Sequence, residues 1–333
     1  MRRRRIGAAS ATLRCMTPDV SSDPRQRLQG LARIAIAGLI WGSIPLVLRS
    51  ADGASAVKVF FRVFCAWIVI AGWLAASGGW REVVSLSRAK LLQVVGQGLI
   101  LTLNWFLFLT AIDMTTVATA ELLAYTGPVF VAALAPYVTG ERFDRRVIAP
   151  LALALIGIVV ILAPHGLEVD SRRELIGAVL AFGSAITYAT LLLRSKKILR
   201  GITSGALMFV EYGVASIVLL PLVVAAYARG DVPSSPGAYA ALIALGVVHT
   251  AFAGYIFLGG LRRVRTDHAA ILTYVEPVSA VVFAAAFLSE ALTWTTIMGG
   301  LLVVGGGVIV ARMDARGGIE TIPIEAAGSE ERL

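Results

Sequence analysis

Charged side chains are scarce in this chain. Asp, Glu, Lys and Arg make up 15% of its 333 residues, whereas a soluble globular domain contains about 25%. The shortage extends along nearly the whole length, and 57% of the residues are hydrophobic. This composition excludes the pair of soluble domains that the length alone would suggest, and it indicates an integral membrane protein.

Cysteine and histidine are also rare. The two cysteines, Cys15 and Cys65, give neither a disulfide framework nor a metal-ligand spacing. The three histidines, His165, His249 and His268, lie far apart in the sequence. A membrane-embedded enzyme such as a lipid-modifying transferase is the alternative of another class, but it would need clustered catalytic residues at the membrane face. We therefore expect no cofactor, no metal and no enzymatic activity.

Long apolar runs fill most of the sequence. A helix that spans a bilayer needs about 20 mostly apolar residues, and ten segments meet this condition. They cover residues 33–49, 57–76, 90–112, 116–138, 146–163, 174–193, 204–227, 238–261, 267–288 and 294–312. The connections are short, so we expect an all-α polytopic membrane protein with both termini on one side.

Basic residues are distributed unevenly between the two sets of connections. The set that includes both tails contains 24 Lys and Arg residues, counting Arg33 and Arg312 at the tail ends of the first and last spans, and the opposite set contains five. The richer set consists of the N-terminal tail, 77–90, 139–146, 194–203, 262–266 and the C-terminal tail. Because positive charge accumulates on the cytoplasmic side, we expect both termini in the cytoplasm. This orientation accounts for the net charge of +9, and no nucleic-acid partner is expected.

The two ends of the chain are polar. We expect residues 1–32, which open MRRRR, to form a basic disordered tail, with Met16 as an alternative start, and residues 313–333 to form a cytoplasmic tail. A cleavable signal peptide ending near Ala54-Ser55-Ala56 is the alternative. Cleavage there would leave nine spans and an unpaired first half.

An internal repeat divides the chain. A shift of 149 residues aligns the stretch that begins at Phe108 with the stretch that begins at Phe257 without a gap. The same shift pairs Tyr125 with Tyr274, Pro128 with Pro277, Glu141 with Glu290, and Gly157 with Gly306. The halves, 33–163 and 174–312, each hold five spans, so the second is inverted relative to the first. Inverted repeats are typical of secondary transporters, whose substrate site lies near the midplane between the halves.

A family resemblance rests on these repeated motifs. Each half has a Tyr-x-x-Pro helix, a turn with glutamate (Gly140-Glu141-Arg142 and Ser289-Glu290-Ala291) and a glycine-rich helix. Together with Tyr274-Val275-Glu276-Pro277 and the arginine of FFRVFCAW, residues 33–312 resemble the EamA-type ten-helix members of the drug/metabolite transporter superfamily. The resemblance implies metabolite transport across the cytoplasmic membrane, often export, and no particular substrate. The first half departs from the pattern, with Gly127 where the second has Glu276.

Glu276 and Pro277 interrupt the apolar run LTYVEPVSAVVF near mid-bilayer. A charge at that depth costs about 2.5–3.5 kcal/mol, so it normally faces protein or water. Proline leaves one backbone carbonyl unpaired. The pair predicts an interrupted helix that could bind a cation, a proton or an amine; the alternative is a structural acid beside a packing kink. Tyr274 lies about 200° from Glu276 on an ideal helix, so only a distortion at the proline would bring both to one cavity.

Four more ionisable groups lie within apolar runs. Glu121 shares a helical face with Tyr125, and Arg62 has a similar depth. An Arg62–Glu121 pair would be either an inter-helix salt bridge or part of a clamp in which arginine binds a substrate carboxylate. Glu211 lies two turns from the inner end of its run.

Other polar groups at membrane depth allow two interpretations each. His249 lies mid-helix, either as a hydrogen-bonded packing residue or as a proton relay. Asn104 and Trp105 could line a polar and aromatic cavity, or anchor the chain at the interface.

These observations favour a secondary transporter that moves a small organic metabolite outward by alternating access. We favour an amino acid or a related compound, because Arg62 and the buried acids could meet opposite ends of a zwitterion. Drug or dye efflux is the rival function. Proton exchange through Glu276 or Glu121 is a hypothesis for the energy source, and a homodimer is one arrangement that such a protein could adopt. A channel would show a filter loop or a ring of like groups, and neither is evident.

Overall fold

The computed structural model describes residues 23–165, 171–288 and 293–315, and within them the chain is helical and contains no strand. The first half consists of α1 (Pro24–Gly42), α2 (Ile44–Leu48), α3 (Ser55–Ser77), α4 (Trp80–Val84), α5 (Arg88–Met114), α6 (Val117–Ala124), α7 (Gly127–Thr139), η1 (Arg145–Val147), α8 (Ile148–Leu162) and η2 (Ala163–His165). The second half consists of α9 (Arg172–Ile198), α10 (Ser204–Arg229), α11 (Pro236–Ala244), the π-helical segment η3 (Leu245–Phe252), α12 (Ala253–Leu261), α13 (Thr266–Leu272), α14 (Val275–Leu288) and α15 (Trp294–Ala315).

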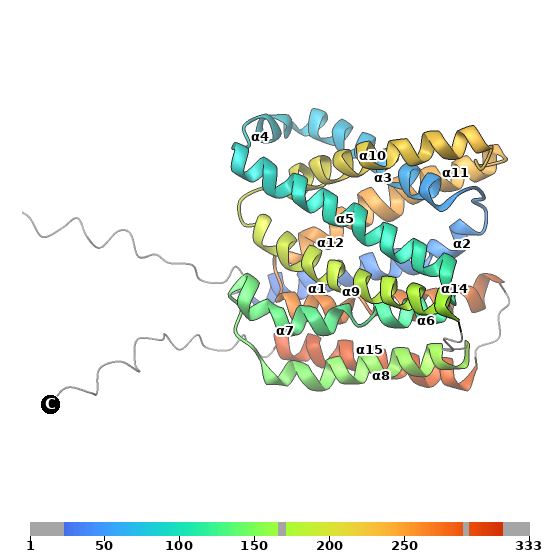
Figure 1. Ribbon diagram of the computed structural model, residues 1–333. Helices are drawn as coiled ribbons and strands as arrows, with labels where there is room; N and C mark the ends of the chain where they lie inside the picture. The colour runs from blue at the N-terminus through green and yellow to red at the C-terminus, as the bar shows by residue number, and fades with distance from the viewer. Residues whose placement is uncertain (1–22, 166–170, 289–292, 316–333) are drawn as a thin grey trace, which may run out of the picture.

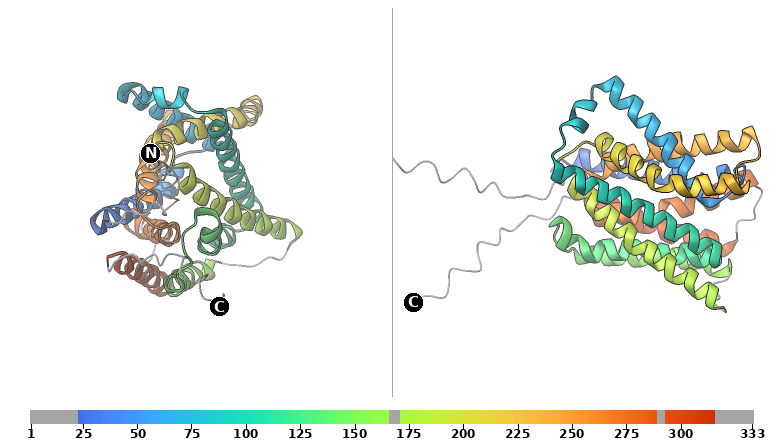
Figure 2. Two further views of the ribbon diagram at one scale, coloured as in Figure 1. Left: turned by 90° about the vertical axis from the view of Figure 1, so that its left-hand side faces the viewer. Right: turned by 45° about the horizontal axis from the view of Figure 1, so that its top comes forward.

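These helices form ten spans, as the sequence predicts. Ten stretches of the described chain, from Pro24–Leu48 to Trp294–Ala315, are long and apolar enough to cross a membrane. They lie side by side in one bundle, and the first and last of them have their terminal ends on the same side of it (Figure 1). We call this side the termini end and the opposite side the far end. Figure 2 (left) looks at the bundle from the termini end.

The first span starts earlier than the sequence analysis expected. Residues 24–32, which were assigned to the tail, belong to α1. The Asp23 side chain accepts a hydrogen bond from the Arg25 amide at 2.9 Å, and Pro24 occupies the first helical position. An aspartate cap followed by proline is a favourable helix start. At the other end, residues 313–315 of the expected C-terminal tail belong to α15. The remaining parts of both expected tails, with Met16, and Glu290 of the second repeated turn lie outside the described residues.

The packing between spans follows the two-fold relation of the repeat. α5 packs along α9, and their counterparts α12 and α1 pack in the same way. The contact of α7 with α9 has its counterpart in the contact of α14 with α1. α3 with α10, and α8 with α15, each pair a span with its own repeat equivalent. The two inverted halves are therefore interlocked along their whole length.

The α8–α15 pair shows this symmetry at the level of single residues. A side chain at Gly157 would meet the Gly299 carbonyl at 2.6 Å, and one at Gly306 would meet the Pro150 carbonyl at 2.7 Å. The shift of 149 residues exchanges these two contacts. Small residues let helix backbones approach closely inside a membrane, which is how such pairs associate.

Candidate functional site

Both Tyr-x-x-Pro spans are broken at the tyrosine. The fourth span divides into α6 and α7 around Tyr125, and the ninth divides into α13 and α14 around Tyr274. In the fourth span the Val129 amide bonds to Thr126 at 3.0 Å, and the Tyr274 hydroxyl donates to the Tyr125 carbonyl at 2.6 Å. The two rings also touch, with centroids 6.1 Å apart. Each break therefore faces the other, and irregular backbone inside a membrane is stable only where protein or water satisfies it.

The two breaks differ in the residue two positions after the tyrosine, which is Gly127 in the fourth span and Glu276 in the ninth. A side chain at Gly127 would meet the Tyr188 ring at 2.7 Å and the Ala185 carbonyl at 3.3 Å. The Tyr188 hydroxyl donates in turn to the Thr273 hydroxyl at 3.2 Å, which ties α9 to the break of the ninth span. The first half therefore has no room for a counterpart of Glu276, because the Tyr188 ring occupies that space.

Arg62 of α3 is held in a fixed orientation. Its Nε donates to the Thr250 hydroxyl at 2.8 Å, and its guanidinium carbon lies 4.8 Å from the centroid of the Trp105 ring. The Thr250 hydroxyl donates in turn to the Leu245 carbonyl at 3.0 Å. No hydrogen bond to a described residue engages the two terminal nitrogens of Arg62. Stacking on an aromatic ring together with one fixed donor leaves the edge of the guanidinium that binds carboxylates bidentately.

Thr250 can reach Arg62 because the eighth span contains a π-helical segment, η3. The Trp41 indole donates to the His249 carbonyl at 2.7 Å, and the Tyr212 hydroxyl contacts the Thr250 carbonyl at 3.4 Å. These side chains satisfy carbonyls that a wider helical turn presents to its neighbours. Such π-segments are frequent at functional sites.

His249 forms part of the packing around this π-segment. The Ser43 hydroxyl donates to the Ile40 carbonyl at 2.7 Å, and the Ser43 oxygen lies 2.9 Å from His249 Nε2. Nε2 therefore donates to Ser43, since the single hydroxyl proton is already engaged. Nδ1 lies 3.4 Å from the Ala244 carbonyl. The imidazole thus joins η3 to the break between α1 and α2 at Ser43.

Glu276 and Glu121 complete the central group. Glu276 lies close enough to Arg62 and to Glu121 for electrostatic interaction with each. Although they are surrounded by helices, Glu121, Glu276 and Arg62 are only half-buried. No hydrogen bond to a described residue engages either carboxylate, and no ion pair joins Arg62 to Glu121 in the part of the chain that the structure describes. The Arg62–Glu121 salt bridge considered from the sequence is therefore not formed.

The position of Glu276 depends on tight packing of α14 against α1. A side chain at Gly42 would meet the Glu276 carbonyl at 2.8 Å and would overlap the Ser279 hydroxyl. Pro277 is buried at the start of α14, next to Glu276. The backbone of α1, itself interrupted at Ser43, thus lies directly against the interrupted ninth span.

Two of the residues singled out from the sequence are placed apart from this group. Asn104 is buried and uses its amide nitrogen to donate to the Ser184 carbonyl at 2.7 Å and to Thr187 at 2.9 Å, which ties α5 to α9. Glu211 is buried on α10 next to Tyr212. The shift of 149 residues pairs Glu211 with Arg62, so equivalent positions of the two halves carry opposite charges.

Two residues of the group were not singled out from the sequence. Thr250 forms part of η3, and Trp41 bonds to it. A threonine or a tryptophan in an apolar run gives no signal of its own, and the π-segment has no spacing that marks it. The one available signal was proximity, because Thr250 follows His249 directly.

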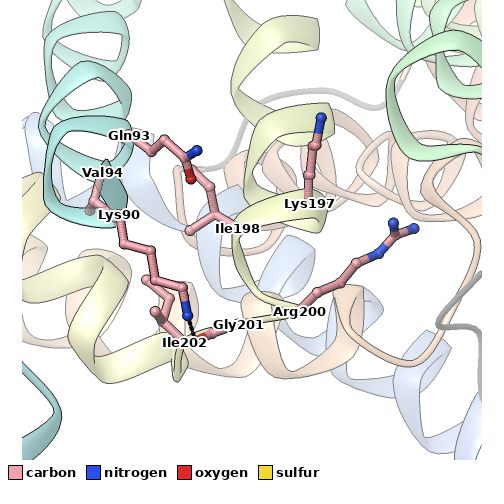
Figure 3. A pocket seen from close by; sticks show the side chains of 8 residues that line it. All are labelled: Lys90, Gln93, Val94, Lys197, Ile198, Arg200, Gly201 and Ile202. Carbon is pink, nitrogen blue, oxygen red and sulfur yellow. Dashed lines mark hydrogen bonds between the residues drawn. The ribbon is translucent and has the colours of Figure 1, made fainter. Parts of the chain in front are cut away.

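A cavity of about 260 Å³ opens elsewhere, at the termini end between α5 and α9. Its basic lining residues do not converge. Figure 3 shows Lys90 reaching Gly201, whose carbonyl it contacts at 2.9 Å, while Lys197 and Arg200 point away from it. The cavity therefore offers no ready site for an anion, and the central group remains the candidate functional site.

The two halves each match the same family. A model of the EamA-like transporter family matches residues 28–163 and, again, residues 175–312. The chain belongs to the EamA-like transporter family. It is a multi-pass membrane transporter, and not an enzyme.

Similar proteins span nearly the whole transporter. An uncharacterized transporter of Archaeoglobus fulgidus is 28% identical over 85% of this chain and 96% of its own length. The pseudopaline exporter CntI of Pseudomonas aeruginosa is 27% identical over 85% of this chain and 96% of its own. One solved crystal structure, 21% identical, superposes with a TM-score of 0.74 over 87% of this chain and 99% of that one. This last likeness shows that the fold is shared.

Proposed function

We propose that this EamA-family transporter exports small zwitterionic metabolites, with amino acids and related compounds as the favoured class. The observation that carries the proposal is the central group. Arg62 presents an unoccupied guanidinium edge, and Glu276 and Glu121 are two carboxylates without a hydrogen-bond partner among the described residues. A carboxylate of the substrate would bind Arg62, and its ammonium group would lie against Glu276.

Both termini lie in the cytoplasm in this proposal, and the membrane is the cytoplasmic membrane. The support is the distribution of basic residues, 24 on the side of the tails against five on the other. Export agrees with one relative, the pseudopaline exporter CntI of Pseudomonas aeruginosa. The inverted halves supply two states of similar energy, one open to each side.

The test of function is a release assay. Cells that express the transporter are loaded with labelled amino acids and dipeptides, and efflux is compared with that of Glu276→Gln. We expect efflux of at least one compound, reduced about 100-fold in the variant, because the amide cannot balance an ammonium group. Glu211→Gln is the control, since Glu211 is a more deeply buried glutamate of a span that likewise has no hydrogen-bond partner among the described residues, and it does not interact with Arg62.

Three outcomes separate the alternatives. Loss in Glu276→Gln with near-normal efflux in Glu211→Gln supports the central site. Equal efflux in all three proteins removes Glu276 from the site while the transporter remains. Efflux of cationic dyes and of no amino acid would replace the substrate class by that of a drug exporter.

Proton exchange is the energy source that we propose, with Glu276 or Glu121 carrying the proton between substrate cycles. The support is the pair of half-buried carboxylates that interact with each other beside a single cation. The purified transporter, reconstituted in vesicles, should release its substrate faster when a proton gradient is imposed. Equal rates with and without the gradient would exclude the exchange.

A further inference from the structure

A second cluster of ionisable groups lies at the termini end, outside the central site. It surrounds the first turn of α13, which begins the broken ninth span at the termini end. His268, Asp267 and Asp314 are each less than 5% exposed, and Glu141 and Lys196 are buried beside them. Several buried ionisable side chains at one end of the bundle are more than packing requires, because each costs free energy unless it is paired.

The first turn of α13 is tied to three other parts of the chain. The Glu141 carboxylate, which follows α7, accepts from the Thr266 amide at 2.9 Å and from the Thr266 hydroxyl at 2.8 Å. Arg265 pairs with Asp267 at 2.6 Å and donates to the Arg142 carbonyl at 2.9 Å. These contacts join the fourth span of one half to the ninth span of the other at the termini end.

The third tie runs through His268 to the last span. His268 Nδ1 lies 2.8 Å from an oxygen of Asp314 on α15, so Nδ1 carries a proton and donates. Asp314 has no cation as a partner in the described chain. A buried carboxylate of this kind is costly unless a positive charge accompanies it.

The other ring nitrogen of His268 is placed for a proton. Nε2 is buried and has no hydrogen-bond partner among the described residues. It lies 4.0 Å from an oxygen of Asp267. In neutral histidine Nε2 would be an acceptor that faces a carboxylate, which is unfavourable. In protonated histidine it becomes a donor toward that carboxylate, and the imidazolium supplies the charge that Asp314 lacks.

The charged groups on the neighbouring elements leave this role to His268. Lys196 of α9 donates to the carbonyls of Leu261 and Val264, both at 2.8 Å. Arg265 is already engaged by Asp267. On the side of α7 and α8 lie Glu141 and Asp144, which are both acidic, and α1 brings the buried Arg27. None of the three cations is recorded in contact with Asp314.

We propose that His268, between Asp314 and Asp267, is a proton-binding site whose occupancy locks the termini end of the transporter closed. A proton bound at Nε2 makes the Nδ1 bond to Asp314 charge-assisted, so it strengthens the tie between α13 and α15 and with it the Glu141–Thr266 contact between the halves. When that proton leaves, the tie weakens, and α13 moves more readily, together with the start of the span that carries Glu276. This site is separate from Glu276 and Glu121, and it makes the conformational step sensitive to pH on the side of the tails.

The test uses a cysteine as a reporter and needs no substrate. Both native cysteines are replaced by alanine, and Val264→Cys is introduced, because Val264 is fully buried two residues before α13 begins and the new side chain is smaller. The purified full chain is treated with N-ethylmaleimide at about pH 6 and about pH 8, where histidine changes its charge. The same reporter in a His268→Gln chain is the matched control, since the thiol and its own ionisation are identical.

At about pH 6 the cysteine of the His268 chain should be modified about tenfold more slowly than in His268→Gln, because one charge-assisted hydrogen bond is lost in the variant. At about pH 8 the two rates should agree. Asp314→Asn, which keeps His268, should behave like His268→Gln, and His249→Gln should retain the pH dependence.

A rate ratio that is the same at both pH values would overturn the proposal. If His268→Gln does not yield a monodisperse protein, the ratio of modification rates at the two pH values is measured with Asp314→Asn in its place. Because no transported compound is present, failure here leaves the proposed export untouched, and failure of the release assay leaves this site untouched.

Discussion

The fourth and ninth spans follow the same backbone course and carry different chemistry. Each breaks at a tyrosine two residues before the position where one span has Gly127 and the other Glu276. In the first half that position is filled by the Tyr188 ring, and in the second a carboxylate lies near Arg62. The comparison shows that the repeat supplies a symmetric pair of breaks, while only the second half carries a carboxylate at this position.

Making the two spans alike should have the largest effect. Gly127→Glu would force a charged side chain into the space of the Tyr188 ring, 2.7 Å from a new Cβ. Overpacking and an unpaired buried charge together should cost more than about 3 kcal/mol. We expect little folded protein by size-exclusion chromatography in detergent. Gly127→Ala should be milder, and Tyr188→Ala should restore part of the yield of Gly127→Glu. Normal yield of the single variant would contradict the packing argument.

In the proposed site the carboxylate of the ninth span lies near a cation, Arg62, and Thr250 holds that cation in place. Thr250→Val removes the acceptor of the 2.8 Å bond from Arg62 Nε. A hydrogen bond to a charged group contributes about 1.5–3 kcal/mol, so the concentration for half-maximal transport should rise about tenfold or more. Thr250→Ser keeps the hydroxyl and should restore the affinity. An equal defect in both variants would mean that Thr250 acts only through the shape of η3.

The tyrosines at the two breaks are equivalent by sequence and unequal in bonding. The Tyr274 hydroxyl donates to the Tyr125 carbonyl at 2.6 Å, whereas the Tyr125 hydroxyl has no partner recorded in the described chain. Tyr274→Phe should therefore lower the free energy of unfolding by about 1 kcal/mol, and Tyr125→Phe by clearly less. Thermal unfolding of the two variants in detergent measures the difference. Equal losses would show that the bond across the breaks contributes nothing.

Much of this arrangement could be predicted from the sequence. Ten spans, two inverted halves and an interruption at Tyr274-Glu276 follow from the long apolar runs, the 149-residue shift and Pro277. The ends of the runs were less certain: α1 begins at Pro24 because Asp23 caps it, a local signal that a hydropathy pattern does not include.

The partners of the ionisable groups were beyond the sequence. Arg62 and Glu121 have similar depths, yet Arg62 bonds to Thr250, because η3 places that hydroxyl within reach. Depth along the membrane can be read from position in a span. The direction in which a side chain points around the helix axis depends on packing between spans, and a π-segment changes that direction. The sequence analysis therefore did not identify Thr250 or Trp41.

The smallest expected effect concerns Glu141, where the fourth span meets the ninth. Burial raises the pKa of its carboxyl above the ordinary value, against the opposing effect of Lys196. A raised pKa means that the folded state binds the proton more readily than the unfolded state. The contribution of Glu141 to stability should therefore increase as the pH falls through the raised folded pKa toward the unfolded value, by less than about 1 kcal/mol.

Glu141→Gln should flatten that part of the stability profile. Thermal unfolding between about pH 5 and about pH 7, in a His268→Gln background, isolates the carboxyl from the imidazole. A variant that stays parallel to its parent over this range would show that the two bonds from Thr266 hold Glu141 ionised throughout. The link between the fourth and ninth spans would then be a fixed cap, and only His268 would remain to make the termini end respond to pH.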